Sequence, residues 1–131
     1  MTAPVHVLVV APTPAIAETV TSRLVDLRVN VTLVTSFNAA RQGLRESPPD
    51  LVISEVRLGE FNGLHLALRA RSQGVRAIVL GDNDQVTRRE AAALGADYLS
   101  DDADTAEFNA AVQSVALAPK ERFGRQRIHA A

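Results

Sequence analysis

The chain alternates short apolar runs with longer amphipathic segments, and this pattern repeats five times. The apolar runs are residues 5–10, 31–35, 51–56, 76–80 and 97–100. Most of them are rich in β-branched residues and almost continuously apolar, which is typical of strands buried on both faces. Strands that alternate with helices predict a parallel sheet covered by helices on both sides. The sequence therefore predicts an α/β fold, a three-layer αβα sandwich with a five-stranded parallel sheet.

Capping and turn residues place helices between these runs. Thr13 and Pro14 predict the start of the first helix, with the Thr13 side chain as N-cap and proline at the first helical position. Residues 58–63 are expected to form a loop, and Asp84 is expected to cap the fourth helix. The inner face of the third helix is expected to comprise Leu64, Ala67 and Leu68.

Composition excludes several classes of protein. Apolar residues make up 47% of the 131, enough for the core of one domain, and the absence of cysteine excludes disulfides and thiolate zinc sites. The net charge of −1 gives no overall attraction to nucleic acid or membranes. No apolar run approaches the ~20 residues of a membrane span, and the first residues lack a secretion signal. A cytoplasmic location is therefore expected.

Several short motifs, in order and suitably spaced, carry a family resemblance. They are VLVV at 7–10, PDLVI at 49–53, VRL at 56–58 with NGL at 62–64, AIVL at 77–80, and GADYL at 95–99. Together they make the chain resemble a response-regulator receiver (CheY-like) domain. The resemblance covers residues 1–117 and leaves 118–131 as a basic C-terminal tail or the start of a linker. It implies the flavodoxin-like strand order 2-1-3-4-5, with any site at the carboxyl ends of the strands.

The resemblance also identifies where the chemistry of a receiver is expected, and most of those positions hold other residues. The family places an acidic pair that binds magnesium directly after the first strand, where this chain has Ala11 and Pro12. Neither side chain offers the oxygen ligands that magnesium requires. The phospho-accepting aspartate at the end of the third strand is replaced by Glu55. Its extra methylene shifts the carboxylate by ~1.5 Å, a large error for phosphoryl transfer.

The second half of the pocket departs from the family in the same way. The hydroxyl residue after the fourth strand is replaced by Gly81, and the lysine after the fifth strand by Asp101. Asp102 stands where a proline usually follows that lysine, whereas Tyr98 retains the switch aromatic. The resemblance thus implies a degenerate receiver, or pseudo-receiver, without catalytic residues or magnesium. It would act in two-component signal transduction through protein contacts.

Three other interpretations stay open. One is a phospho-accepting receiver with a non-standard acceptor, and another is the detached input domain of a DNA-binding regulator. A small-molecule binder of flavodoxin-like shape is the third, although no glycine-rich phosphate loop follows the first strand. Nucleic acid would be a partner only if an output domain follows the tail.

Individual residues also have two interpretations each. Glu55 either mimics a phosphorylated state or pairs with an arginine, for which Arg57 is the candidate. Tyr98 is either a switch or a packed core residue. The acids that should gather at one edge of the sheet form either a displaced metal site or a solvated rim. These acids are Glu55, Asp82, Asp101 and Asp102.

Two basic regions are candidate contact surfaces. Arg88 and Arg89 lie on the fourth helix, and the resemblance implies a homodimer face made by that helix, the fifth strand and the fifth helix. The alternative is two solvated arginines. In the tail, four cations face one acid, Glu121, which suits either a basic arm or a loosely docked terminus. The cations are Lys120, Arg122, Arg125 and Arg127.

Overall fold

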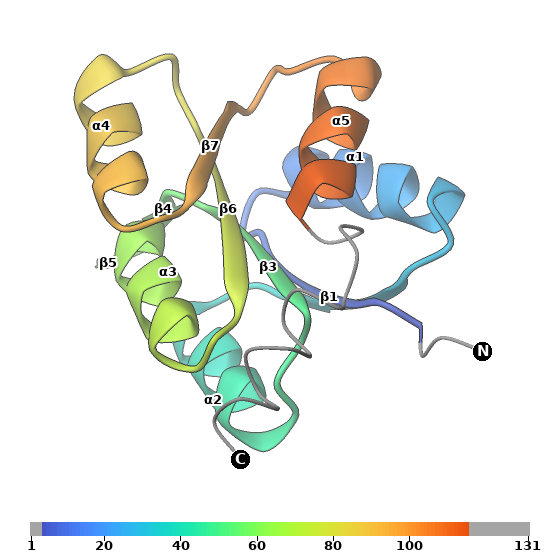
Figure 1. Cartoon of the computed structure of the whole chain (residues 1–131), viewed down its shortest axis with the longest axis horizontal. Coiled ribbons are helices and arrows are strands. Elements are labelled where there is room, and N and C mark those ends of the chain that lie inside the picture. The colour runs from blue at the N-terminus through green and yellow to red at the C-terminus, as the bar shows by residue number, and fades with distance from the viewer. Residues whose placement is uncertain (1–3, 116–131) are drawn as a thin grey trace, which may run out of the picture.

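The computed structural model describes residues 4–115, and in this part of the chain five parallel strands form the central sheet. They are β1 (His6–Val10), β2 (Asn30–Val34), β3 (Leu51–Glu55), β6 (Arg76–Gly81) and β7 (Asp97–Ser100). Their order across the sheet is β2-β1-β3-β6-β7 (Figure 1). Counting only the strands of this sheet, the order is 2-1-3-4-5. The predicted fold class and strand order are therefore confirmed.

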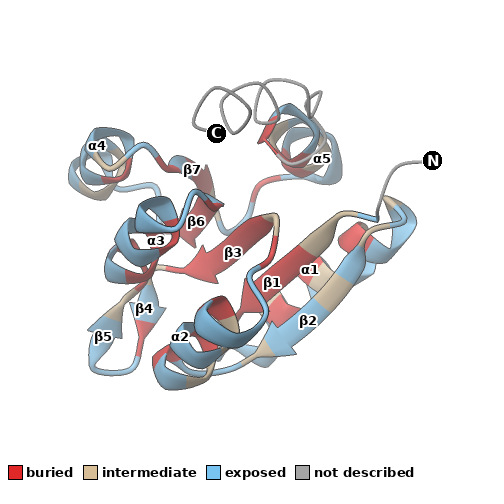
Figure 2. Ribbon diagram, turned by 60° about the horizontal axis from the view of Figure 1, so that its bottom comes forward, coloured by how far each residue is buried: buried red, intermediate tan, exposed pale blue. Residues whose placement is uncertain are grey.

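Five helices cover the two faces of this sheet. They are α1 (Pro14–Asp26), α2 (Phe37–Glu46), α3 (Gly63–Ser72), α4 (Gln85–Ala93) and α5 (Thr105–Val115). Helices α1 and α5 lie side by side on one face, whereas α2, α3 and α4 lie on the other (Figures 1 and 2). Both faces of β1 and β3 are buried (Figure 2), which explains their continuous apolar sequences.

The hydrophobic core consists of two layers separated by the sheet. Alternate residues of β1 enter opposite layers: Val7 and Val9 pack toward α1 and α5, whereas Leu8 and Val10 pack toward α2 and α3. This alternation is the period-2 geometry of a strand. At the start of α4, the Asp84 side chain accepts a hydrogen bond from the Val86 backbone, so the predicted cap is confirmed.

The segment after β3 differs from the prediction. Residues 58–63, expected to be a loop, contribute to a small antiparallel hairpin of β4 (Arg57–Leu58) and β5 (Phe61–Asn62). On α3, Leu66 is buried and Leu68 is 48% exposed, so the inward position assigned to Leu68 was wrong. The sheet-facing stripe starts at Gly63 and recurs at Leu66, Ala67 and Ala70, which is the i, i+3, i+4, i+7 spacing of a helix. Leu68 falls outside that stripe.

The predicted boundary near residue 117 and the basic tail at 118–131 lie outside the described residues. Within residues 4–115, no helix has the length and apolar character needed to cross a membrane.

Candidate functional site

A hollow of about 380 Å³ opens at the carboxyl ends of the strands, where the topology of an open parallel sheet places ligand sites. Its lining includes six residues to which a role was assigned from the sequence. These residues are Glu55, Gly81, Tyr98, Asp101, Thr13 and Asp82. The hollow therefore lies at the edge of the sheet where a site is expected, and the contacts inside it decide what it can do.

Glu55 is the last residue of β3, and its carboxylate is turned toward the start of α1. The side chain is only 8% exposed. The Thr13 backbone N–H donates to Oε2 at 2.9 Å, and the Thr13 hydroxyl donates to Oε1 at 2.8 Å. Thr13 immediately precedes the helix, so the carboxylate also lies at the positive end of the helix dipole. Glu55 thus ties the end of β3 to the loop between β1 and α1.

This contact changes the role predicted for Thr13. The residue is the N-cap of α1, as expected, but its side chain forms no capping hydrogen bond within the helix. Its hydroxyl is used by Glu55 instead. A threonine hydroxyl serves equally well as a local cap or as a donor to a distant carboxylate. Sequence spacing alone therefore gave no signal for this pair, which lies 42 residues apart in the chain.

Ala11 and Pro12 lie at the same edge but supply no polar side chain. Ala11 is buried, and its backbone N–H donates to the Val34 carbonyl at 3.0 Å, which extends the pairing of β1 with β2. Pro12 is exposed and lacks a backbone donor. Within residues 4–115, no three acidic or histidine side chains lie close enough together to hold a metal ion.

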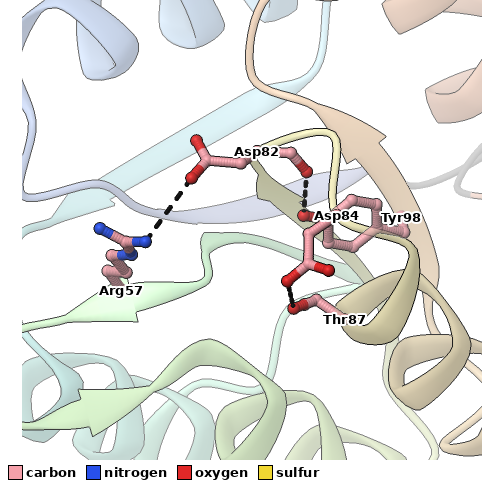
Figure 3. A network of polar contacts seen from close by, with 5 residues as sticks. All are labelled: Arg57, Asp82, Asp84, Thr87 and Tyr98. Carbon is pink, nitrogen blue, oxygen red and sulfur yellow. Dashed lines mark hydrogen bonds and ion pairs between the residues drawn. The ribbon is translucent and has the colours of Figure 1, made fainter.

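The acids expected to converge at this edge separate into different contacts. Asp82 forms an ion pair with Arg57 at 3.5 Å, and both side chains are highly exposed (Figure 3). The suggested pairing of Arg57 with Glu55 is therefore wrong. Arg57 is the exposed residue of the hairpin strand β4, whereas the Glu55 carboxylate is turned inward to α1. Asp101 lines the hollow, but Asp102 does not and instead accepts a hydrogen bond from the Ser100 hydroxyl at 2.5 Å.

Gly81 and Tyr98 form a second buried contact beside the hollow. The Tyr98 hydroxyl donates to the Asp82 backbone carbonyl at 2.5 Å, which holds the ring over the end of β6 (Figure 3). A Cβ atom placed on Gly81 would lie 2.4 Å from that hydroxyl oxygen and 2.8 Å from Cγ2 of Val56. The tyrosine ring thus occupies the space that any side chain at position 81 would need. Tyr98 is 8% exposed and belongs to the core.

The surroundings of Tyr98 also affect its ionisation. Burial is the main cause that raises the pKa of its phenol above 10.0, and the negative charges of Asp84 and Asp82 add to the effect. Arg88 lies over the ring, with its guanidinium carbon 5.0 Å from the centroid, and donates to the Tyr98 carbonyl at 3.4 Å. Arg88 is thus half-buried against the tyrosine rather than a solvated arginine, whereas Arg89 is exposed.

The fold and this edge define a class of protein: a doubly wound α/β domain whose polar hollow lies at the ends of its parallel strands. The model of the response regulator receiver domain matches residues 7–113. The chain therefore belongs to the response-regulator receiver family, the family of signalling domains in two-component systems. A comparison with curated proteins found no significant match.

Solved structures show the same fold. A candidate response regulator from Chloroflexus aurantiacus superposes with a TM-score of 0.82 at 23% identity, covering 88% of this chain and 99% of that one. The receiver domain of a sensor histidine kinase from Pseudomonas aeruginosa, solved with magnesium in its active site cleft, gives 0.77 at 24% identity, covering 88% and 100%. The signal receiver domain of an HD domain-containing protein from Pseudomonas fluorescens gives 0.78 at 26% identity, covering 86% and 94%.

Proposed function

We propose that this chain is a degenerate receiver, a cytoplasmic signalling module that works through protein contacts without aspartyl phosphorylation. The observation that carries the proposal is the pair of hydrogen bonds from Thr13 to the buried carboxylate of Glu55. At the position of the family's phospho-acceptor, a carboxylate with both oxygens held by protein donors has a structural role, because it links the end of β3 to the start of α1. It is no longer a free nucleophile that can approach a phosphorus atom.

The residues directly after β1 support the same proposal. Phosphoryl transfer depends on positioning and on positive charge at the transferred oxygens, which a metal ion normally supplies. Ala11 and Pro12 offer no side-chain oxygens after β1, and the Glu55 oxygens are already engaged by Thr13. This donor set does not fit an octahedral oxygen site. We therefore propose that the domain does not use magnesium.

The charge of the hollow adds to this argument. Asp82, Asp84 and Asp101 line it, and Arg57 is the cation among its lining residues. Arg57 is already paired with Asp82. Two like unit charges about 4 Å apart near a protein surface repel by about 4 kcal/mol. Asp101 therefore opposes an incoming phosphoryl group at the position where the family has a lysine.

The Gly81–Tyr98 contact supports a fixed conformation rather than a switch. Position 81 has no hydroxyl with which to follow a phosphoryl oxygen, and the Tyr98 ring fills the space beside it. The ring is further held by the Asp82 carbonyl and by Arg88. Signalling would then depend on which partner recognises this one arrangement. A homodimer through α4, β7 and α5 is one such contact, and on α4 the exposed Arg89 and Val86 are available for it.

The test is incubation of the protein with acetyl phosphate and magnesium, followed by intact mass spectrometry. We expect no phosphoryl adduct. The matched control is the triple variant A11D/P12D/E55D, which restores the three family carboxylates on the same backbone and should regain magnesium binding. A magnesium-dependent adduct on the unmodified chain, mapped by peptide sequencing to Glu55 or a neighbouring aspartate, would contradict the proposal and establish a receiver with a non-standard acceptor.

A further inference from the structure

A groove lined by three arginines lies between α2 and α3, away from the hollow described above. It has a volume of about 200 Å³. The residues that line it are Arg41, Leu44 and Arg45 from α2, with Arg69, Ser72 and Gln73 from the end of α3. All three arginines are exposed. The groove therefore offers positive charge at a surface that is distinct from the acidic edge.

The three arginines have no acidic partner within residues 4–115. An ion pair elsewhere in this part of the chain joins Arg57 to Asp82 and involves none of the three. Glu46, the acid at the end of α2, accepts a hydrogen bond from the Gln42 amide at 2.9 Å. Cations in the last turn of a helix are stabilised by the helix dipole, which explains Arg45 and Arg69. Arg41 lies in the middle of α2, so the dipole does not explain why it joins them.

The shape of the groove indicates which anion it suits. Arg41 and Arg45 are one helical turn apart, about 6 Å along the axis, and Arg69 faces them from the second helix. The positive charges are therefore spread over about one helical turn of α2 and over both helices that border the groove, which suits an anion with several separate charges. The side chain of Leu44, which is buried, gives the groove an apolar component that suits the methylene groups of acidic side chains.

The number of charges argues against nucleic acid. A stable complex with duplex DNA commonly neutralises about six to ten phosphates, whereas this groove presents three cations. The net charge of −1 and the acidic hollow would repel the rest of a long polyanion. Three guanidinium groups instead match a short segment with two or three carboxylates, which arginine binds in a bidentate manner.

We propose that the groove between α2 and α3 binds an acidic, extended segment of a partner protein. The proposal rests on the proposed function, since it gives a signalling domain that works through protein contacts one of its contact surfaces. It requires nothing of Glu55, Gly81 or Tyr98. A failure here would therefore leave the mass-spectrometric result on phosphorylation unaffected, and the two proposals are tested separately.

The experiment is a fluorescence-anisotropy titration of a labelled oligoglutamate peptide with the whole protein, in the absence of magnesium. We expect saturable binding that weakens as salt is added. The variant R41Q/R45Q should bind about tenfold more weakly, because it removes two charge-assisted contacts. The variant R28Q/R71Q, which removes two exposed arginines that do not line the groove, should bind like the unmodified protein. Circular dichroism of each variant checks that the fold is retained.

Competition experiments distinguish the other anions. Inorganic phosphate and a single-stranded oligonucleotide are added to the peptide complex, with oligoglutamine as the neutral control. The proposal predicts that neither phosphate nor the oligonucleotide displaces the peptide at equivalent concentration, and that oligoglutamine does not bind. Absence of peptide binding, equal losses in both arginine variants, or tighter binding of phosphate or oligonucleotide would each overturn it.

Discussion

Substitution of Gly81 by alanine tests whether the Tyr98 ring occupies the space that a side chain at position 81 would need. The new Cβ would lie 2.4 Å from the tyrosine hydroxyl oxygen and 2.8 Å from Cγ2 of Val56, so at least one of these groups must move. Inserting a methyl group into a packed site typically costs about 1–3 kcal/mol. Replacing glycine by alanine also restricts the unfolded chain, which offsets about 0.4–1 kcal/mol. We therefore expect a net loss of about 1–2 kcal/mol in the free energy of unfolding.

The assay is urea unfolding followed by far-ultraviolet circular dichroism, which does not rely on tyrosine as the probe. Tyr98→Phe alone should cost about 1 kcal/mol, because it removes the hydrogen bond to the Asp82 carbonyl. The same change removes the shortest contact of the new Cβ, so the double variant G81A/Y98F should be more stable than the sum of the two single costs predicts. A Gly81→Ala protein as stable as the original, with unchanged Tyr98 side-chain shifts, would refute the argument that the ring fills this space.

Three further predictions follow from the same contacts. Glu55→Ala should lower the free energy of unfolding by about 2–3 kcal/mol, because it removes two hydrogen bonds to a charged group, whereas Glu55→Gln should cost about half as much. Urea unfolding measures both changes, and equal stability of all three proteins would contradict a structural role for the contact between Glu55 and Thr13. The phenol of Tyr98 should titrate above pH 10.0 in an ultraviolet absorbance titration, because burial raises its pKa. The contribution of the protonated phenol to stability is complete below pH 10.0 and is lost as the pH rises through the folded-state pKa. A midpoint at or below 10.0 would be inconsistent with the buried ring. If α4 forms a homodimer face, V86D/R89E should reduce the mass measured by light scattering from dimer to monomer, and a dimer that persists in this variant would exclude the face.

The fold was accessible from sequence because local pattern and burial agree. Val7, Leu8, Val9 and Val10 read as a strand buried on both faces, and the structure divides them between two core layers. Leu68 was misassigned because a leucine between two sheet-facing positions satisfies a loosely drawn apolar stripe. When the helical repeat is counted from the buried Gly63, Leu68 falls on the exposed side of α3. Sequence patterns thus predicted the elements well and their exact orientation less well.

The site was accessible only in part. The positions at the strand ends followed from topology, so Glu55 and Gly81 were identified correctly as lining one edge. Their partners were not, because Thr13 and Tyr98 lie 42 and 17 positions away in the chain and meet them only through tertiary packing. Arg57 was nearer to Glu55 in sequence, but the hairpin after β3 carries it outward to Asp82. Sequence proximity was a poor guide to pairing wherever the chain turned.

The most direct test of the central claim is a titration with beryllofluoride and magnesium, followed by the backbone amide signals of Thr13 and Glu55. Beryllofluoride mimics a phosphoryl group bound to a carboxylate. We predict no saturable change in either signal, because the Glu55 oxygens are held by Thr13 and no three acidic or histidine side chains within residues 4–115 lie close enough together to hold a metal ion. A saturable shift of both signals that requires magnesium would show that the carboxylate leaves Thr13 and accepts the mimic, and would contradict the account.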